Sequence, residues 1–418
     1  MIYSIHDNPK TIKELLLFSL QMLLSVFVAT ALIAVICGVN TSAALVGAGL
    51  STIVYLICTG FNSPMFISNS GAFVAPVIAA LALGGYYAVA VGGVVTAIVY
   101  CLFGVIFSKI NVDKIYKVFP KSLIGAVTAV IGLNLMAFIQ TYVQVNGQTS
   151  QWGVVIALVT MLAVAIISHY AKGLLSILPF LVGTLIGYAI AIILTVIGVA
   201  PLVDFSVFKD IGLFCVPEFG FTKWDVVPMV QLIPIIIIYV AYTISAMMEC
   251  LSDHAALGGI IGVDLYRKPG LSKIFIGEGV ANLFSSFFGG LGACSYGESV
   301  ATVGFSRVAS TRVTLVSAIM LIALGFIAPI QALIASIPSC VFAGDAIILY
   351  GFIACSGIKM LKNVDLNNQK NLIIVSSVLS LGVCGIVVGG ETVNFSATAL
   401  ALIVGIILNF ILKENSND

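Results

Sequence analysis

The sequence predicts an all-α polytopic membrane protein with fourteen transmembrane segments, arranged as two inverted repeats of seven. Of its 418 residues, 61% are hydrophobic and only 8% are charged, whereas soluble domains have about 25% charged residues. Apolar runs of about 20 residues, long enough to span a bilayer as a helix, recur along the whole chain. Lys and Arg also alternate between successive loops. These observations predict a single membrane domain over residues 1–418.

The apolar runs divide into two sets of seven segments. The first set lies at about 14–36, 41–60, 66–83, 86–108, 121–142, 152–171 and 174–197. The second set lies at about 228–255, 271–288, 296–304, 312–334, 338–358, 371–388 and 395–412. The first run shows no small-residue cleavage pattern, so a removable signal peptide is not expected.

The distribution of basic residues gives the orientation. If the N-terminus is cytoplasmic, sixteen of the eighteen Lys and Arg residues fall in the cytoplasmic loops and termini, and only Lys209 and Lys223 do not. Basic residues concentrate on the cytoplasmic side of membrane proteins. We therefore expect a multi-pass protein of the cell membrane with both termini in the cytoplasm. The net charge of +1 gives no indication of nucleic-acid binding.

Two segments are poor transmembrane helices. The third contains Asn69, Ser70 and Gly71, and the tenth region, GGLGACSYGESVATVG, is Gly-rich and polar. Irregular backbone at membrane depth is tolerated only against protein or a wet cavity, so both are predicted to be broken helices at a central site. Each is the third segment of its seven, and a Pro-Gly pattern in the fifth recurs in the twelfth. This favours inverted repeats, as in secondary transporters, over chance similarity.

The eighth segment contains three ionisable residues in the stretch MMECLSDHAALGG. Glu249 and Asp253 are four positions apart and share a helix face, whereas His254 lies about 100° further round. Two carboxylates that close in a low dielectric are not expected to ionise together, so the pair is expected to hold or exchange a proton. Alternatively, Asp253 caps the helix end or pairs with Arg267 or Lys268.

Glu278, Glu298 and Asp345 are further acids inside apolar segments. Glycine beside Glu298 lets backbone N–H groups approach a ligand, and a helix that restarts there directs its positive end into the cavity. This combination suits a neutral planar ligand with N–H and C=O groups along one edge. A phosphate loop is disfavoured because no GK[ST] follows. Asp345 is predicted either to line the cavity or to lie at a helix interface.

Several motifs resemble those of a known family. The run YGESVATVGFSR at 296–307 resembles the nucleobase/ascorbate transporter signature [QE]-N-x-G-x(4)-T-[RK], and ECLSD resembles that family's eighth-helix motif. Glu278 precedes Glu298 by the spacing of the family's ninth-helix acid or amide. DLYRKPGL, ILYGFIACSGIKML and VDLNNQKNLI look like the bacterial uracil permease branch. The resemblance covers nearly the whole chain and implies import of uracil or a close relative by proton symport.

The resemblance also implies an architecture. It predicts a core subdomain at about 14–108 and 228–334 and a gate subdomain at about 121–197 and 338–412. Short antiparallel strands in the broken third and tenth segments would cross at mid-membrane. Elevator-like movement of core against gate and a homodimer are further implications.

Site residues are carried over from the family position by position. The implied substrate-binding residues are Glu249, Glu298, Gly297, Tyr296, Gly71 and Ala29. The two glutamates would accept hydrogen bonds from ring N–H groups, and backbone N–H groups near the two glycines would meet carbonyl oxygens. Asp253 and Glu278 would handle the proton, and Tyr350 would contact the site from the gate. No metal or organic cofactor is implied; H⁺ is the expected coupling ion, with Na⁺ left open.

The sequence departs from the family pattern at several of these positions. Ser299, Ala301 and Ser306 replace the Asn, Gly and Thr of the signature, and Gly71 replaces an aromatic residue. Met22 and Asp253 stand where uracil permeases have His. An Asp at 253 resembles the purine carriers, whereas Glu at 298 resembles the pyrimidine carriers. Substrate choice therefore stays open between uracil and a purine such as xanthine or urate.

Three other functions are less well supported by the sequence. An anion carrier of the sulfate or bicarbonate type would share the repeat plan but would not be expected to place acids at its site. A membrane enzyme would need a nucleophile with a base or a metal cluster, and the three histidines, His6, His169 and His254, are not arranged as one. A passive channel would not require buried titratable acids.

Overall fold

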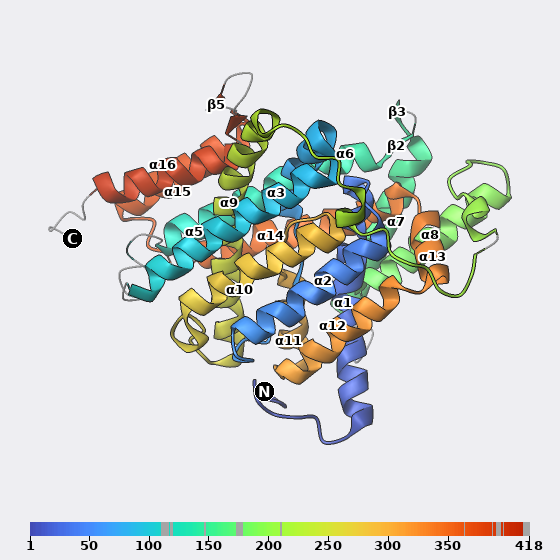
Figure 1. Ribbon diagram of the computed structural model, residues 1–418, viewed down its shortest axis with the longest axis horizontal. Coiled ribbons are helices and arrows are strands. Elements are labelled where there is room, and N and C mark those ends of the chain that lie inside the picture. Colours follow the sequence, from blue (N-terminus) through green and yellow to red (C-terminus); the bar gives the residue numbers. More distant parts are fainter. Residues whose placement is uncertain are drawn as a thin grey trace.

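The computed structural model describes residues 1–109, 117, 120–145, 148–172, 179–209, 211–362, 364–386, 388–389, 394–395 and 397–412. Most of these residues are helical (Figure 1). The first part of the chain forms α1 (Ile12–Cys37), α2 (Thr41–Cys58), β1 (Ile67–Asn69), η1 (Gly71–Phe73), α3 (Val74–Lys109), α5 (Lys121–Leu135), η2 (Met136–Phe138), α6 (Ile139–Tyr142), β2 (Gln144–Val145), β3 (Gln148–Thr149), α7 (Gln151–Tyr170) and α8 (Pro179–Val196).

The second part begins after a long linker that contains η4 (Phe205–Phe208) and η5 (Gly220–Lys223). It forms α9 (Met229–Ile261), η6 (Tyr266–Gly270), α10 (Leu271–Phe284), η7 (Ser285–Gly289), β4 (Ala293–Ser295), α11 (Gly297–Ser306), α12 (Thr311–Gly325), α13 (Ala328–Ser336), α14 (Ser339–Leu361), α15 (Gln369–Val383), β5 (Val388–Gly389), β6 (Asn394–Phe395) and α16 (Ala397–Ile411).

Seven of the described helices are long and apolar enough to cross a membrane, and four shorter apolar helices accompany them. The kink in α3 falls at Gly84 and Gly85, between the segments predicted at 66–83 and 86–108. The segment predicted at 312–334 is two helices, because Pro329 lies in the first turn of α13 and cannot donate an N–H to a continuing helix. Positions 174–178 of the predicted seventh segment lie outside the described residues.

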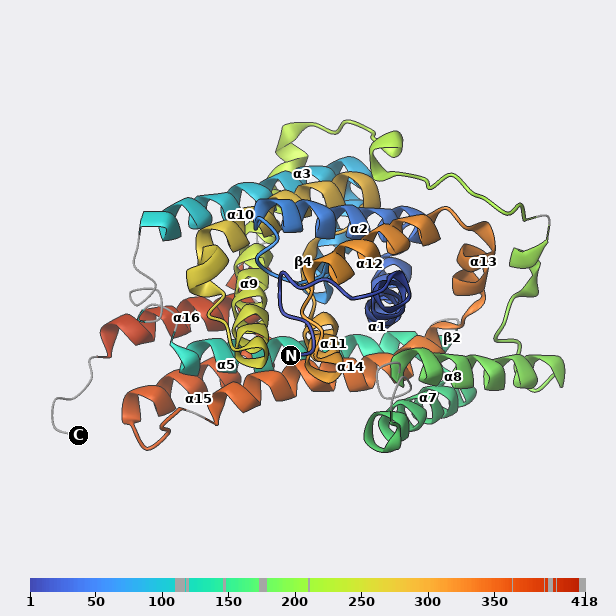
Figure 2. The same cartoon turned by 90° about the horizontal axis from the view of Figure 1, so that it is seen from below.

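The helices pack as two groups. In one group α3 contacts α9 and α10, and α2 contacts α10 and α12; in the other, α14 contacts α5, α7 and α8, and α15 contacts α16. Figure 2 shows α2, α3, α10 and α12 as one layer and α5, α14 and α15 as another, with α1, α9 and α11 between them. α9 and α11 therefore lie where the two groups of helices face each other.

Two short strands from distant parts of the chain pair at the centre. β1 and β4 are antiparallel, with Ile67 opposite Ser295 and Asn69 opposite Ala293. The Asn282 side chain fixes β4, since its Oδ1 accepts from the Ala293 N–H at 2.8 Å and its amide donates back to the Ala293 carbonyl. β1 leads into η1 and β4 leads into α11, so a helical turn begins close to each strand.

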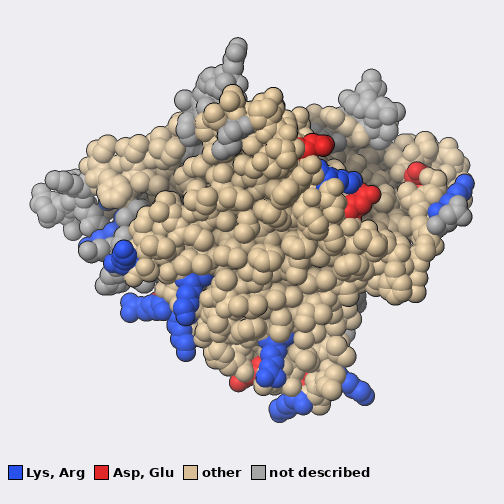
Figure 3. All heavy atoms as spheres, viewed as in Figure 1, with Lys and Arg blue, Asp and Glu red and all other residues tan. Residues whose placement is uncertain are grey.

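The surface is largely uncharged. Figure 3 shows most of the visible Lys and Arg side chains along the lower and lower-left margins of the molecule. The broad middle band is covered by uncharged side chains, as expected for a surface in contact with lipid.

Candidate functional site

Hydrogen bonds to α1 hold the β1 strand at the centre of the molecule. Thr30 Oγ1 lies 2.7 Å from Ser68 Oγ, and the Asn69 amide donates to the Thr30 carbonyl at 3.2 Å. All three side chains are fully buried. Buried polar groups of this kind are stable only when they are paired, so β1 has a defined position against α1.

Glu249 on α9 faces the turn that follows β1. Ser70 Oγ donates to Glu249 Oε2 at 3.3 Å and also accepts from the Ala72 N–H at 3.1 Å. Ser70 therefore caps the start of η1 and orients a carboxylate at the same time. Glu249 also lies close enough to Glu278 and Glu298 to interact with both electrostatically.

Asp253 lies one turn further along α9, opposite the start of α11. A Cβ at Gly297 would lie 3.9 Å from Asp253 Oδ1, so the glycine leaves room between the carboxylate and the α11 backbone. Asp253 Oδ2 has no hydrogen-bond partner within the described part of the chain. Arg267, one of the cations considered as its partner, forms an ion pair with Asp264 at 3.2 Å.

Glu278 on α10 is fully buried and holds β4. Its Oε1 accepts from the Ser295 N–H at 3.2 Å, and its Oε2 accepts from Cys294 Sγ at 3.5 Å. Both carboxylate oxygens are therefore engaged with the strand that precedes Tyr296 and Gly297. This position explains why an acid occurs inside such an apolar helix.

Glu298 lies in the first turn of α11, whose N-cap residue Tyr296 makes no side-chain cap. The Ser299 N–H donates to the Tyr296 carbonyl at 3.0 Å, and the helix dipole favours a hydrogen-bond acceptor at this end of α11. Tyr350 of α14 is buried and lies in the neighbourhood of Glu298 and Tyr296. The Tyr296 hydroxyl has no partner among the residues that the structure describes. Unpaired polar groups thus gather at the start of α11.

The other predicted residues are on α1, η1 and α14. Ala29 and Met22 are on the buried face of α1, and Gly71 begins η1. Asp345 lies elsewhere, because its Oδ2 accepts from Thr184 Oγ1 of α8 at 2.6 Å. The structure therefore places Asp345 at the interface of α8 and α14.

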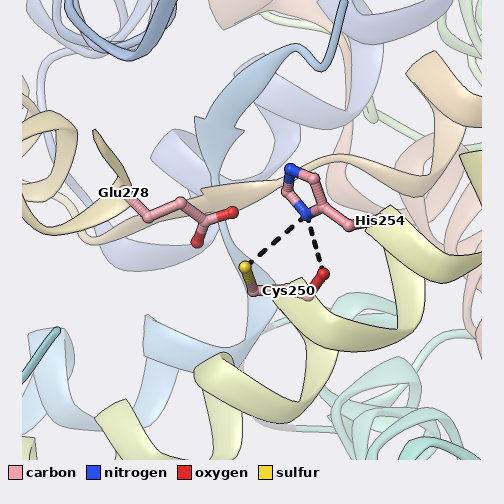
Figure 4. A group of neighbouring side chains, drawn as sticks. All are labelled: Cys250, His254 and Glu278. Atoms are coloured by element: carbon pink, nitrogen blue, oxygen red, sulfur yellow. Dashed lines mark hydrogen bonds between the residues drawn. The ribbon is translucent and has the colours of Figure 1, made fainter. Parts of the chain in front are cut away.

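Glu278 also forms a buried cluster with His254 and Cys250 (Figure 4). Their ligand-type atoms lie within 4.8 Å of one another, a spacing at which metal binding has to be considered. However, His254 Nδ1 is 2.8 Å from the Cys250 carbonyl and Nε2 is 2.6 Å from the Tyr55 hydroxyl. Both ring nitrogens are engaged, so the cluster braces α9 against α2. Sequence reasoning missed Tyr55, which is 199 residues away in the chain.

A cavity of about 380 Å³ opens beside this cluster. It lies where the end of α9 faces the start of α5 and the end of α14, and its lining includes Lys121, His254, Gly258, Gly259, Asp264 and Met360. Its volume is within the range of small-molecule pockets. The cavity reaches α9 at His254, the residue that follows Asp253.

The family model that matches this chain and two similar proteins are described as permeases. A sequence model described as a permease family matches residues 13–390. The uracil permease of Bacillus caldolyticus is 34% identical over 417 residues, covering 98% of this chain and 94% of that protein. The uracil permease of Escherichia coli K12 is 32% identical over 417 residues, covering 98% and 93%.

Solved structures show a related fold. The transmembrane domain of the cyanobacterium bicarbonate transporter BicA matches with a TM-score of 0.66 at 17% identity, covering 97% of this chain and 99% of that chain. SLC26A9 matches with a TM-score of 0.65 at 14% identity, covering 96% and 66%. At such low identity the likeness concerns the fold alone.

Proposed function

Because the chain belongs to the permease family, we propose that it is a secondary active transporter that imports uracil or a closely related nucleobase by proton symport. Two relatives named uracil permeases, 34% and 32% identical and matched over nearly their full length, support this substrate class. The proposal includes fourteen transmembrane segments in two inverted repeats, both termini in the cytoplasm and a homodimeric assembly in the cell membrane.

The observation that supports the proposal is that Glu249 and Glu298 lie near enough to influence each other electrostatically, at the start of a helix that has no side-chain cap. Glu249 lies next to the β1–η1 turn, and Glu298 lies in the first turn of α11. In the proposal the two carboxylates accept hydrogen bonds from ring N–H groups. The backbone N–H groups at Gly71 and Gly297 donate to the carbonyl oxygens, while Tyr296 and Ala29 line the pocket. A site with donors and acceptors at fixed positions discriminates strongly against analogues that lack one group.

Proton coupling is proposed for Asp253 and Glu278. Glu249 interacts with Glu278 and Glu298, and Asp253 interacts with Glu249. Four carboxylates so close together in a low dielectric cannot all remain ionised, so the group holds protons that substrate binding can redistribute. The same reasoning leaves Na⁺ open as the coupling ion, since a cation would also offset this charge.

Alternating access is proposed to occur by movement of one helix group against the other. The two groups meet around α9 and α11, and in the proposal Tyr350 of α14 contacts the site from the opposite group. Displacement of α1–α3 with α9–α12 past α5, α7, α8 and α14–α16 would carry the site from one side to the other. Binding sites between two repeats are typical of such carriers.

The main alternative is a xanthine or urate carrier of the same family, which Asp253 favours. Its Oδ2, which has no hydrogen-bond partner among the described residues, offers an extra acceptor for a purine N–H. An anion carrier is a weaker alternative that shares the fold, because several carboxylates at the site would repel an anionic substrate.

The experiment is uptake of labelled uracil and xanthine by proteoliposomes that contain the purified protein. We expect uracil uptake to rise with an inward acid gradient and to collapse when a protonophore removes it. Dominant xanthine uptake would establish the alternative. Absence of gradient-driven flux of any nucleobase would refute the proposal.

Two carboxylates inside apolar helices provide matched variants. Glu298→Gln replaces an acceptor at the proposed site and is expected to lower uracil uptake at least 10-fold, since a lost charge-assisted hydrogen bond is worth about 1.5–3 kcal/mol. Asp345→Asn alters a buried carboxyl at the α8–α14 interface and should keep most of the uptake. Equal losses in both variants would mean that the site is wrongly placed.

A further inference from the structure

The linker between α8 and α9, residues 197–228, has an unusually apolar surface for a segment outside the helices. Several of its large hydrophobic side chains are exposed, and Phe214, Val216 and Val226 are 74%, 85% and 77% exposed. The other members of this exposed set are Ile197, Val199, Phe205, Phe208, Ile211, Leu213 and Phe221. Large apolar side chains exposed together along one segment mark contact with another protein or with a membrane.

Backbone hydrogen bonds prevent these side chains from turning inward. The Cys215 N–H donates to the Phe326 carbonyl at 3.0 Å, and the Ala328 N–H donates to the Leu213 carbonyl at 3.1 Å. Cys215 Sγ lies 3.7 Å from the Gly325 carbonyl. Because neighbouring side chains alternate along extended backbone, the inward position of Cys215 directs Phe214 outward.

Aromatic contacts anchor the second half of the linker. Trp224 meets Phe287 edge to face at 5.1 Å and Tyr87 at 5.9 Å. Phe219 and Phe221 stack at 5.5 Å and both meet Phe288. The linker is therefore held against α3, η7 and the α12–α13 junction, and in Figure 1 it follows the upper right of the molecule.

Both ends of the linker continue into apolar helix surfaces. Ile193 and Val196 are exposed at the end of α8, and Val230 and Ile233 are exposed at the start of α9. Both helices are among those long and apolar enough to span a membrane. The exposed apolar side chains of the linker thus continue the apolar surfaces of two helices that are long and apolar enough to cross a membrane.

From this continuity we propose that the 197–228 linker lies in the boundary between lipid headgroups and acyl chains, with its exposed apolar side chains inserted into the bilayer. Aromatic residues with a few charges beside them are typical of this zone. Lys223 and Glu218 form an ion pair there, and Lys209 is exposed. A lipid surface fits better than a protein partner, because the apolar side chains follow the ends of two spanning helices.

Tryptophan fluorescence tests the depth of the linker. The two native tryptophans, Trp152 and Trp224, are replaced by Phe. Because Trp224 packs against Phe287, this background is used only if it stays monodisperse with an unchanged unfolding temperature. Single tryptophans are then introduced as Phe214→Trp and Val216→Trp, with Lys209→Trp as the polar control in the same linker. Each protein is reconstituted into phosphatidylcholine vesicles with or without bromine on the acyl chains near the headgroup.

We expect brominated lipid to quench Phe214→Trp and Val216→Trp at least twice as strongly as Lys209→Trp, and aqueous iodide to show the reverse order. Quenching of Phe214→Trp by iodide but not by brominated lipid would place the linker in water and overturn the proposal. Protection from both quenchers would indicate a protein partner, including a second copy of the chain, and would also overturn it. None of these readings depends on transport.

Discussion

Gly132 on α5 provides a sharp test of how the helices of the second group pack. A Cβ at this position would lie 2.3 Å from the backbone nitrogen of Ala354, 2.8 Å from its Cα and 2.8 Å from the Tyr350 carbonyl oxygen. All three atoms belong to the α14 backbone and cannot rotate away. Gly132→Ala therefore requires α5 and α14 to separate by about 1 Å, since unbonded carbon atoms normally approach to about 3.5–4.0 Å.

The cost of this separation can be estimated from two opposing effects. Overpacking a close contact typically costs about 1–3 kcal/mol, and the rigid backbone partner favours the upper end. Replacing Gly by Ala in a helix returns up to about 1 kcal/mol. We expect a net destabilisation of about 2 kcal/mol. Tyr350, whose carbonyl is among the crowded atoms, should also be displaced from Glu298, so nucleobase affinity should fall.

Gly351→Ala is the matched control on α14 itself. Among the described residues, no atom outside its own helix backbone lies within 4 Å of a Cβ at Gly351, so the substitution should leave stability unchanged or raise it slightly. The assay is the temperature at which half of the detergent-solubilised protein remains monodisperse after heating, measured with the KM for uptake. If Gly132→Ala matched Gly351→Ala in both measurements, the close approach of α5 and α14 would be refuted.

Three further changes test other parts of the structure. Tyr55→Phe leaves His254 Nε2 buried without its partner and should cost about 1–3 kcal/mol of stability, whereas an unchanged unfolding temperature would mean that the 2.6 Å contact is absent. Thr184→Val removes the donor to Asp345 and should lower the unfolding temperature, and adding Asp345→Asn to it should cost less than the two changes separately. Gly259→Trp fills open space in the cavity of about 380 Å³ and should block uptake while the protein stays folded; normal uptake would exclude the cavity from the transport route.

Features that depend on local chemistry leave a signal in the sequence. Asn69, Ser70 and Gly71 break the apolar pattern, and a strand and a 3₁₀ turn occur there. The division between the third and fourth segments coincides with the kink at Gly84 and Gly85. By contrast, the helix break between α12 and α13 in the segment predicted at 312–334 was missed although Pro329 marks it, because apolar residues continue on both sides.

Contacts between distant segments could not be predicted from composition or spacing. His254 was separated from Glu249 and Asp253 by helical geometry alone, but its partner Tyr55 lies on another helix and carries no sequence signal. The position of Asp345 beside Thr184 depends likewise on how α8 packs against α14. Such pairings follow from tertiary packing, which one sequence does not reveal.

Asp253 and Glu278, the two acids assigned to proton coupling, differ in whether protonation would disturb a hydrogen bond within the protein. Both oxygens of Glu278 accept hydrogen bonds from β4, so protonation would give one of them a hydrogen where it now faces a donor. Asp253 Oδ2 has no partner within the described residues, so protonation there breaks no protein contact. We therefore infer that Asp253 exchanges the proton and that Glu278 positions β4 and the start of α11.

Two conservative variants separate these roles. Asp253→Asn should leave the unfolding temperature unchanged but make uracil uptake insensitive to the proton gradient, because the amide cannot exchange a proton. Glu278→Gln should lower the unfolding temperature, because an amide NH₂ would replace the carboxylate oxygen that accepts from Cys294 Sγ. The uptake that remains in this variant should still respond to the proton gradient. Gradient-insensitive uptake by Glu278→Gln with normal stability, together with a normal gradient response in Asp253→Asn, would reverse the assignment.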